Sequence, residues 1–236
     1  MAMVRSRARV RQFLASNIGS TMTDRARFAR AMSRARQFEL ARGRGGLRFR
    51  RSAPGRAVEF KSIDADCNGN VDSGGRLVLL NGCTRGGDIN QREGRQINIR
   101  SVELHAKASV TDGTGIDQVH RYMIVYDRQT NGAAPTVGQI LTSGVVQAMR
   151  KLENRQRFRI LWDERVQLNA SAEPGSRKVL SFYRRLFLRT TFNEGDTGNV
   201  SDIATGSLYF ICFSDRPAGG TAGSCACAVR VRFTES

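Results

Sequence analysis

Residues 96–110 read QINIRSVELHAKASV, and their alternation of apolar and polar side chains decides the fold class. Ile97 and Ile99 share one parity, and the apolar residues from Val102 onward share the other. Because side chains alternate between the two faces of a strand, this pattern predicts one long β-strand with a bulge near Ser101.

The sequence on either side of this run, from about residue 58 to the end, repeats the pattern in shorter runs separated by glycine-rich and polar segments. Residues 122–126 are apolar at every position, as for a strand between two layers, and residues 135–150 predict at most one or two short helical turns. Further strands are predicted over residues 58–63, 77–80, 158–168, 180–192, 209–213 and 225–233. Seven or eight strands with almost no long helix indicate an antiparallel sandwich or barrel.

The first 56 residues have a different composition. They contain fifteen arginines and no lysine, and Asp24 and Glu39 are their only acidic residues, so they carry +13 of the chain's formal charge of +17. Such an arm predicts a polyanionic partner, because phosphates release counterions when arginines neutralise them. The sequence therefore divides into a nucleic-acid-binding arm, residues 1–56, and a nearly neutral β-rich body, residues 57–236.

Residues 21–41 of the arm predict a helix, since Thr23 or Asp24 can cap its N-terminus and Gly43 can end it. A disordered tail is the alternative, because blocks of like charge repel one another. The whole chain has 34 arginines and 4 lysines, and this excess favours single strands, since a guanidinium bridges phosphates and stacks on exposed bases. Binding is expected to be non-specific and salt-sensitive. The predicted nucleic-acid-binding residues are Arg5, Arg7, Arg9, Arg11, Arg25, Arg27, Arg30, Arg34, Arg36, Arg42, Arg44, Arg48, Arg50 and Arg51.

Several runs of the body resemble viral coat proteins. They are VEFKSID at 58–64, LNG at 80–82, DINQREGR at 88–95, RYMIVYDRQ at 121–129 and NRQRF at 154–158. In this order they are similar to capsid proteins of circular, Rep-encoding single-stranded DNA viruses. Those proteins are in turn similar to the coat proteins of satellite tobacco necrosis virus and its relatives, and the basic arm lies where those families have one.

The resemblance implies an all-β chain, with residues 57–236 forming a single eight-stranded antiparallel jelly-roll sandwich and the arginine-rich arm partly helical. It implies a capsid protein that self-assembles into a small icosahedral shell, in the T=1 arrangement of about sixty copies. The shell would package a single-stranded genome, DNA rather than RNA by resemblance to the circular-DNA group. The expected location is the virion, and the host nucleus during assembly if the genome is DNA.

The sequence carries no catalytic motif. Neither of its two histidines, His105 and His120, has a serine or cysteine motif beside it, and no GxSxG, P-loop or HExxH sequence occurs. An enzyme is therefore not expected, and no membrane partner is expected because no apolar run is long enough for a membrane helix. The alternative function is a nucleic-acid-binding protein with a β-sandwich body that does not assemble.

One segment resembles a calcium loop. Asp64, Asp66 and Asn68 have the spacing of the first three oxygen ligands of an EF-hand, with Gly69 at the turning position. Gly75 stands where the bidentate glutamate belongs, so a surface turn between strands is the better prediction. Weak Ca²⁺ binding stays a hypothesis, because the satellite-virus relatives bind calcium at subunit contacts, and no other cofactor is expected.

The five cysteines have no CxxC pair and are odd in number, which favours neither a disulfide framework nor a zinc site. They are expected to be reduced, small apolar core residues. They are Cys67, Cys83, Cys212, Cys225 and Cys227.

Overall fold

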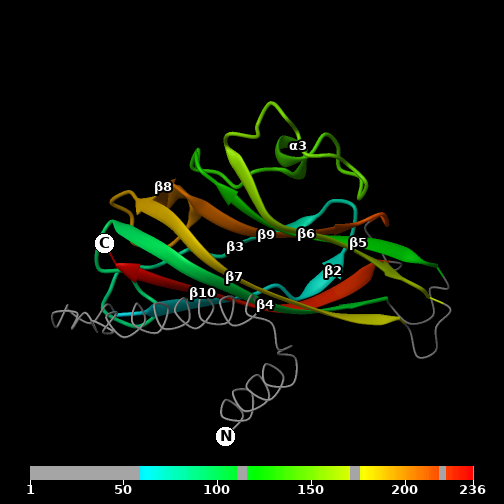
Figure 1. Cartoon of the computed structure of the whole chain (residues 1–236), viewed down its shortest axis with the longest axis horizontal. Helices are drawn as coiled ribbons and strands as arrows, with labels where there is room; N and C mark the ends of the chain where they lie inside the picture. The colour runs from blue at the N-terminus through cyan, green and yellow to red at the C-terminus, as the bar shows by residue number, and fades with distance from the viewer. Residues whose placement is uncertain (1–58, 111–115, 171–175, 218–221, 236) are drawn as a thin grey trace, which may run out of the picture. The chain divides into compact units, whose positions relative to one another are not determined.

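The computed structural model describes residues 59–110, 116–170, 176–217 and 222–235, all of which belong to the unit Ala57–Ser236 (Figure 1). The arm, its predicted helix over residues 21–41 and its fourteen predicted binding arginines lie outside the described residues. No helix within the described ranges is long and apolar enough to cross a membrane.

Two antiparallel sheets stack against each other (Figure 1). The first has the order β1-β10-β4-β7-β8, with β2 paired to β10, and the second has the order β3-β9-β5-β6. The elements are β1 (Lys61–Asp66), β2 (Gly69–Val71), β3 (Arg76–Leu79), β4 (Gln96–Ser109), β5 (Gln118–Asp127), α3 (Val137–Ile140), β6 (Phe158–Leu168), β7 (Arg177–Phe192), η1 (Val200–Asp202), β8 (Ile203–Thr205), β9 (Ser207–Ser214) and β10 (Gly223–Glu235). The all-β prediction is confirmed, and the two four-stranded layers, with β2 and β8 as short additions, are consistent with a jelly roll.

The long strand predicted from residues 96–110 is β4, at the centre of the first sheet. Its register against β7 shifts between Ile99 and Ser101, and its register against β10 shifts at the same place. Against β10, Ile99 and Ser101 pair with the neighbouring residues Phe233 and Arg232, so Arg100 is the extra residue of a bulge. The bulge lets Ile99 and Val102, three positions apart, both lie fully buried. The bulge predicted near Ser101 is confirmed.

The strand β5 is buried on both faces, as predicted for residues 122–126. Tyr122 and Ile124 pack in the core between the sheets, whereas Met123 and Val125 belong to a second cluster on the outer side of the second sheet. Side chains from the 128–157 segment, which contains α3 and lies over this sheet in Figure 1, complete the second cluster. The long connection between β5 and β6 thus acts as a third layer.

Residues 158–168 have apolar side chains at most even-numbered positions, which predicts that these side chains share one face of the strand, but the structure shows that they do not. The register between β5 and β6 shifts so that Leu161 is an extra residue on β6. Phe158 therefore packs in the outer cluster, whereas Val166 and Leu168 pack in the core between the sheets. A bulge reverses the face that alternate residues occupy, and nothing in the apolar pattern marks its position.

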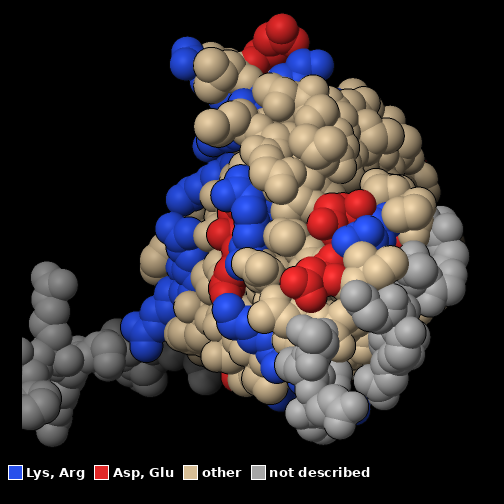
Figure 2. All heavy atoms as spheres, turned by 90° about the vertical axis from the view of Figure 1, so that its right-hand side faces the viewer, with Lys and Arg blue, Asp and Glu red and all other residues tan. Residues whose placement is uncertain are grey.

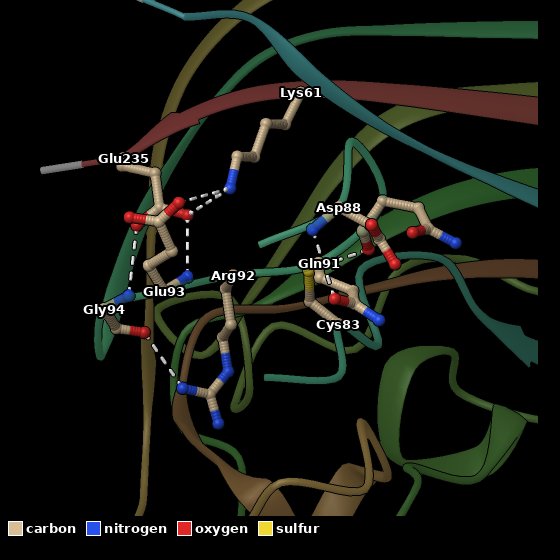
Figure 3. Close-up of polar contacts among 9 residues, drawn as sticks. Lys61, Cys83, Asp88, Gln91, Arg92, Glu93, Gly94 and Glu235 are labelled. Carbon is tan, nitrogen blue, oxygen red and sulfur yellow. Dashed lines mark hydrogen bonds and ion pairs between the residues drawn. The ribbon is translucent and has the colours of Figure 1, made fainter. Parts of the chain in front are cut away.

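The strand predicted at residues 58–63 is β1, which begins at Lys61 and extends further, to Asp66. Lys61 is 1% exposed, and its ammonium lies 3.3 Å from a Glu93 carboxylate oxygen and 3.4 Å from one of Glu235 (Figure 3). The Glu235 carboxylate also accepts hydrogen bonds from the amides of Glu93 and Gly94. Burial opposes ionisation of Glu235, yet these amides and Lys61 lower its pKa. The contacts fasten the segment before β4 to the last residues of β10.

Candidate nucleic-acid interface

The body carries exposed basic side chains of its own, and Figure 2 shows Lys and Arg gathered in a band on one of its faces. Such residues are frequent on β6 and β7, strands that contact each other at one edge of the sandwich. At this edge the Arg184 guanidinium donates a hydrogen bond of 2.7 Å to the carbonyl of Leu161 on the opposite sheet. The exposed basic residues of the two strands are Arg159, Arg165, Arg177, Lys178, Arg184, Arg185 and Arg189.

On the outer face of the first sheet, part of the charge is already neutralised. The Arg230 guanidinium donates to both carboxylate oxygens of Asp64, at 2.7 and 2.6 Å, and its hydrogen bonds lower the pKa of Asp64. Arg232 donates to Glu103 at 2.7 Å, and His105 lies 3.3 Å from the same carboxylate, so the pKa of Glu103 is lowered too. Solvent-exposed pairs of this kind contribute little to stability, but they leave this part of the face close to neutral.

Beside these pairs, the same face carries a groove of about 470 Å³ in which aromatic and arginine side chains alternate. Tyr183, Arg185 and Phe187 come from the exposed parity of β7, while Arg232 comes from β10. The Arg100 guanidinium, at the bulge of β4, lies 6.0 Å from the centre of the Phe187 ring. The groove is lined by Phe60, Arg100, Ser101, Tyr183, Arg185, Phe187, Arg232 and Thr234. We call this set the aromatic–arginine groove.

Sequence reasoning did not identify this groove. In β7, Leu180, Leu186 and Leu188 share one parity, which indicates the buried face of the strand and leaves the opposite parity to solvent. The sequence does contain a signal for the groove. Two aromatic residues, Tyr183 and Phe187, lie on either side of Arg185 on the face that the leucines leave to solvent. The contributions of β4 and β10 depend on strand pairing, which periodicity does not reveal.

Only two of the three residues predicted to bind calcium line a common hollow in the structure. Asp64 and Asp66 lie on β1 and both line a second hollow on the outer face, of about 400 Å³. The Asn68 side-chain oxygen instead accepts a hydrogen bond of 3.1 Å from the amide of Cys227. Two ligands of the EF-hand pattern are therefore engaged by the protein itself, Asp64 by Arg230 and Asn68 by Cys227, and weak Ca²⁺ binding stays a prediction without further support.

The histidines and cysteines form no arrangement typical of catalysis. His120 is fully buried, and burial lowers its pKa to about 4. All five cysteines are buried free thiols, and four of them pack in the core between the sheets. Among the described residues, no group of three or more His, Cys, Asp or Glu side chains is placed to hold a metal.

Comparison with known proteins connects this fold to viral coat proteins. The model of the family described as "Satellite tobacco necrosis virus coat protein" matches residues 57–235. The chain is 28% identical over 174 residues to the coat protein of Maize white line mosaic Satellite virus, covering 70% of this chain and 76% of that protein. It is 27% identical over 154 residues to the capsid protein of Satellite tobacco necrosis virus 1, covering 64% and 75%.

Two solved viral structures also align with the chain. Infectious bursal disease virus, Gx strain, aligns over 75% of this chain and 32% of that one, with 13% identity and a TM-score of 0.29. The pentamer of VP1 from Human Polyomavirus 6 aligns over 77% and 96%, with 10% identity and a TM-score of 0.26. Scores this low do not bear on the fold. The family match does, because it spans the body from its start to the end of β10. The chain therefore belongs to the satellite tobacco necrosis virus coat protein family, so it is a structural protein of the virion and not an enzyme.

Proposed function

We propose that this chain assembles into a closed icosahedral shell and packages a single-stranded genome through its arginine arm. The observation that carries the proposal is the combination of a +13 arm with a body that belongs to a coat protein family. The body contributes only +4 over 180 residues, so the two parts have separate tasks. The arm neutralises phosphates and the body builds the container.

The number of charges suits a small genome. Sixty arms of +13 would bring roughly 780 positive charges into one shell, which offset a comparable number of phosphates before mobile ions neutralise the remainder. Binding of this kind depends on charge and not on base sequence, so packaging selectivity needs another source.

The contacts between subunits are expected along the edges and loops of the sandwich. The third layer, residues 128–157, exposes Val145, Met149 and Leu152, with 56%, 76% and 72% of their surface accessible. Several large apolar side chains exposed on one segment are typical of surfaces that another subunit covers. A closed shell would supply that subunit through its own symmetry.

For the genome, our sequence prediction is DNA, with a nuclear stage of assembly in the host. The family and relatives matched are satellite-virus coat proteins, so they give no support to the circular-DNA part of the resemblance. Digestion of nucleic acid extracted from purified particles decides the question. Loss with DNase and resistance to RNase would support DNA, and the reverse result would overturn that prediction.

Particle formation tests the proposal as a whole. Negative-stain microscopy and light scattering of the expressed protein should show shells of uniform diameter that contain nucleic acid. A variant lacking residues 1–51 should retain a folded body, because the described core contains none of those residues, yet carry much less nucleic acid. A monomer-sized species at both low and high salt would favour the non-assembling alternative, and unchanged nucleic-acid content after the deletion would remove the role of the arm.

A further inference from the structure

We propose that the aromatic–arginine groove is a second nucleic-acid site, which stacks unpaired bases of the strand that the arm neutralises. This inference rests on the proposed packaging function and assigns part of it to the body. It also specifies the ligand, a single strand with accessible base faces.

The pairing of strands brings the groove together. Ser101 of β4 lies between Arg232 of β10 and Arg185 of β7 in the register of the sheet. The small Ser101 side chain does not fill the space between the two arginine side chains, so the groove is open there. Along β7, Tyr183, Arg185 and Phe187 are two residues apart, so they project from one face at intervals of about 6.6 Å.

The aromatic side chains are not part of any core. Phe187 is 83% exposed, Phe60 62% and Tyr183 57%, which is unusual for three large aromatic residues around one groove. Arg100 lies over the Phe187 ring at 6.0 Å, yet most of that ring stays accessible. Flat, exposed rings on a sheet are the platforms on which single-stranded nucleic acids stack their bases.

The charge of the groove is also suited to a polyanion. Three arginines line it, Arg100, Arg185 and Arg232. Among the described residues, Glu103, the partner of Arg232, is the one carboxylate paired with them. No described residue forms an ion pair or a side-chain hydrogen bond with Arg185. A net charge of about +2 beside stacking platforms supplies both contacts that a nucleotide needs, one for the phosphate and one for the base.

The alternative occupant is an apolar segment of another subunit, and the composition of the groove argues against it. Burying Arg185 under such a segment would remove its hydration without providing an anion. The chain also brings nucleic acid near by covalent connection. Phe60 is four residues after Arg56, the last arginine of the arm, and four residues span at most about 14 Å. Duplexes fit less well, because their bases are stacked inside and offer no open face.

The first test uses particles of the full-length chain. Ultraviolet cross-linking followed by trypsin digestion and mass spectrometry should find nucleotide adducts on the peptides 179–184 and 186–189, which contain Tyr183 and Phe187 separately. Adducts there support the proposal. Particles that contain nucleic acid but give adducts on other peptides only, or cross-links from these rings to another copy of the chain, overturn it while leaving the packaging function intact. Failure to obtain particles with nucleic acid overturns the packaging function, and the groove proposal with it.

The second test measures binding by the full-length protein freed of nucleic acid. The probes are a 12-nucleotide oligothymidylate, a 12-nucleotide oligouridylate and a 12-base-pair DNA duplex, at about 0.5 M salt, where the contribution of the arm is small. The double variant Tyr183→Ala, Phe187→Ala should bind both single strands at least 10-fold more weakly, with little change for the duplex and in the salt dependence. Arg185→Gln should instead lower the slope of log K against log salt by about one.

The matched control is Val179→Ala. Val179 is 77% exposed on the same face of β7 but does not line the groove. It should bind like the unmodified protein. If the aromatic double variant also binds single strands like the unmodified protein, or loses affinity for the duplex to the same extent, the groove does not stack bases and the proposal is wrong.

Discussion

Arg121 is a buried cation that connects the third layer to the second sheet. Its guanidinium donates to both carboxylate oxygens of Asp163, at 2.8 and 2.6 Å, and to the carbonyls of Val146 and Ala148, at 2.9 and 2.7 Å. Arg121→Met would leave the partly buried Asp163 carboxylate and the Ala148 carbonyl without a donor, while the Val146 carbonyl would still accept from Arg165. We therefore expect the free energy of unfolding to fall by about 3 kcal/mol. Urea denaturation of the full-length subunit at high salt measures this change.

The control for this prediction is Arg159→Met, which removes an exposed arginine from the neighbouring strand β6. It should change the free energy of unfolding by less than about 0.5 kcal/mol. The double variant Arg121→Met, Asp163→Leu should recover part of the loss, since the unpaired carboxylate is gone. Equal costs for Arg121→Met and Arg159→Met would show that the buried pair does not hold the third layer.

The burial of His120 should make the free energy of unfolding depend on pH. The ring is fully buried; its Nε2 lies 3.1 Å from the Gln118 side-chain oxygen and its Nδ1 2.9 Å from the Tyr122 hydroxyl. The Gln118 oxygen can only accept, so Nε2 carries the proton and neutral Nδ1 accepts from Tyr122. Burial lowers the pKa from 6.5 to about 4, although the charge of Asp215 opposes the shift.

The unfolded chain therefore binds this proton more readily than the folded one. The stabilisation is fully present above about pH 6.5 and is lost as pH falls toward 4, about 2 kcal/mol of it between pH 7 and pH 5. Urea denaturation at the two pH values should show that His120→Gln loses about 2 kcal/mol less over this interval than the unmodified protein. His105→Gln, on the exposed face, should leave the loss unchanged, and an unchanged loss in His120→Gln would contradict the assignment.

At the scale of elements, Gly206 is where the chain passes from the first sheet, after β8, to β9 in the second. Its φ is +85°, and a Cβ there would press against the carbonyl oxygen of Arg189 and lie 2.6 Å from the Tyr126 hydroxyl. Gly206→Ala should cost about 3 kcal/mol or more, because backbone strain and a clash with fixed atoms add. Gly132→Ala is the control, since its φ of +73° is similar but nothing lies within 4 Å.

Thermal unfolding of the two glycine variants separates the two costs. Gly132→Ala should lose only the conformational part, about 1 kcal/mol. If both variants lose the same amount, the close approach at Gly206 does not constrain the crossing between the sheets.

The elements that could be predicted are those whose burial follows a simple period. β4 was predicted with its bulge because Ile99 and Val102 cannot share a face without one, and β5 because it is apolar on both faces. The bulge at Leu161 does not follow from the sequence, since Leu161 and Trp162 are both apolar and the sequence fits either register. Arg121 was not recognised as buried, because its partners Asp163 and the carbonyls of the third layer are assembled only by tertiary structure.

The two proposed nucleic-acid sites differ in the same way, because one can be predicted from the sequence and the other cannot. The arm can be predicted from composition alone, because fifteen arginines in 56 residues indicate a polyanionic partner whatever the fold. The aromatic–arginine groove combines residues from three strands and the segment before β1, and its arginines are not unusual in number. A site created by strand pairing becomes visible only when the register is known.

At the scale of the whole molecule, the charge is divided so unequally that the arm should set the capacity of the shell. Changing Arg5, Arg7, Arg9 and Arg11 to glutamine lowers the charge of the arm from +13 to about +9, so the nucleotides packaged per particle should fall by roughly 30%. Total phosphate per purified particle, divided by the protein content, measures this number. The body is unchanged in this variant, and the diameter of the shell should stay the same.

The control replaces the same four arginines by lysine, which keeps the charge but removes the planar guanidinium. If charge alone sets the capacity, the lysine variant packages the unmodified amount and only the glutamine variant packages less. If both variants package less, stacking or bidentate contacts by the guanidinium groups contribute as well. Full packaging by the glutamine variant would contradict the division of tasks, because the remaining charge of the chain would then be sufficient without these arginines.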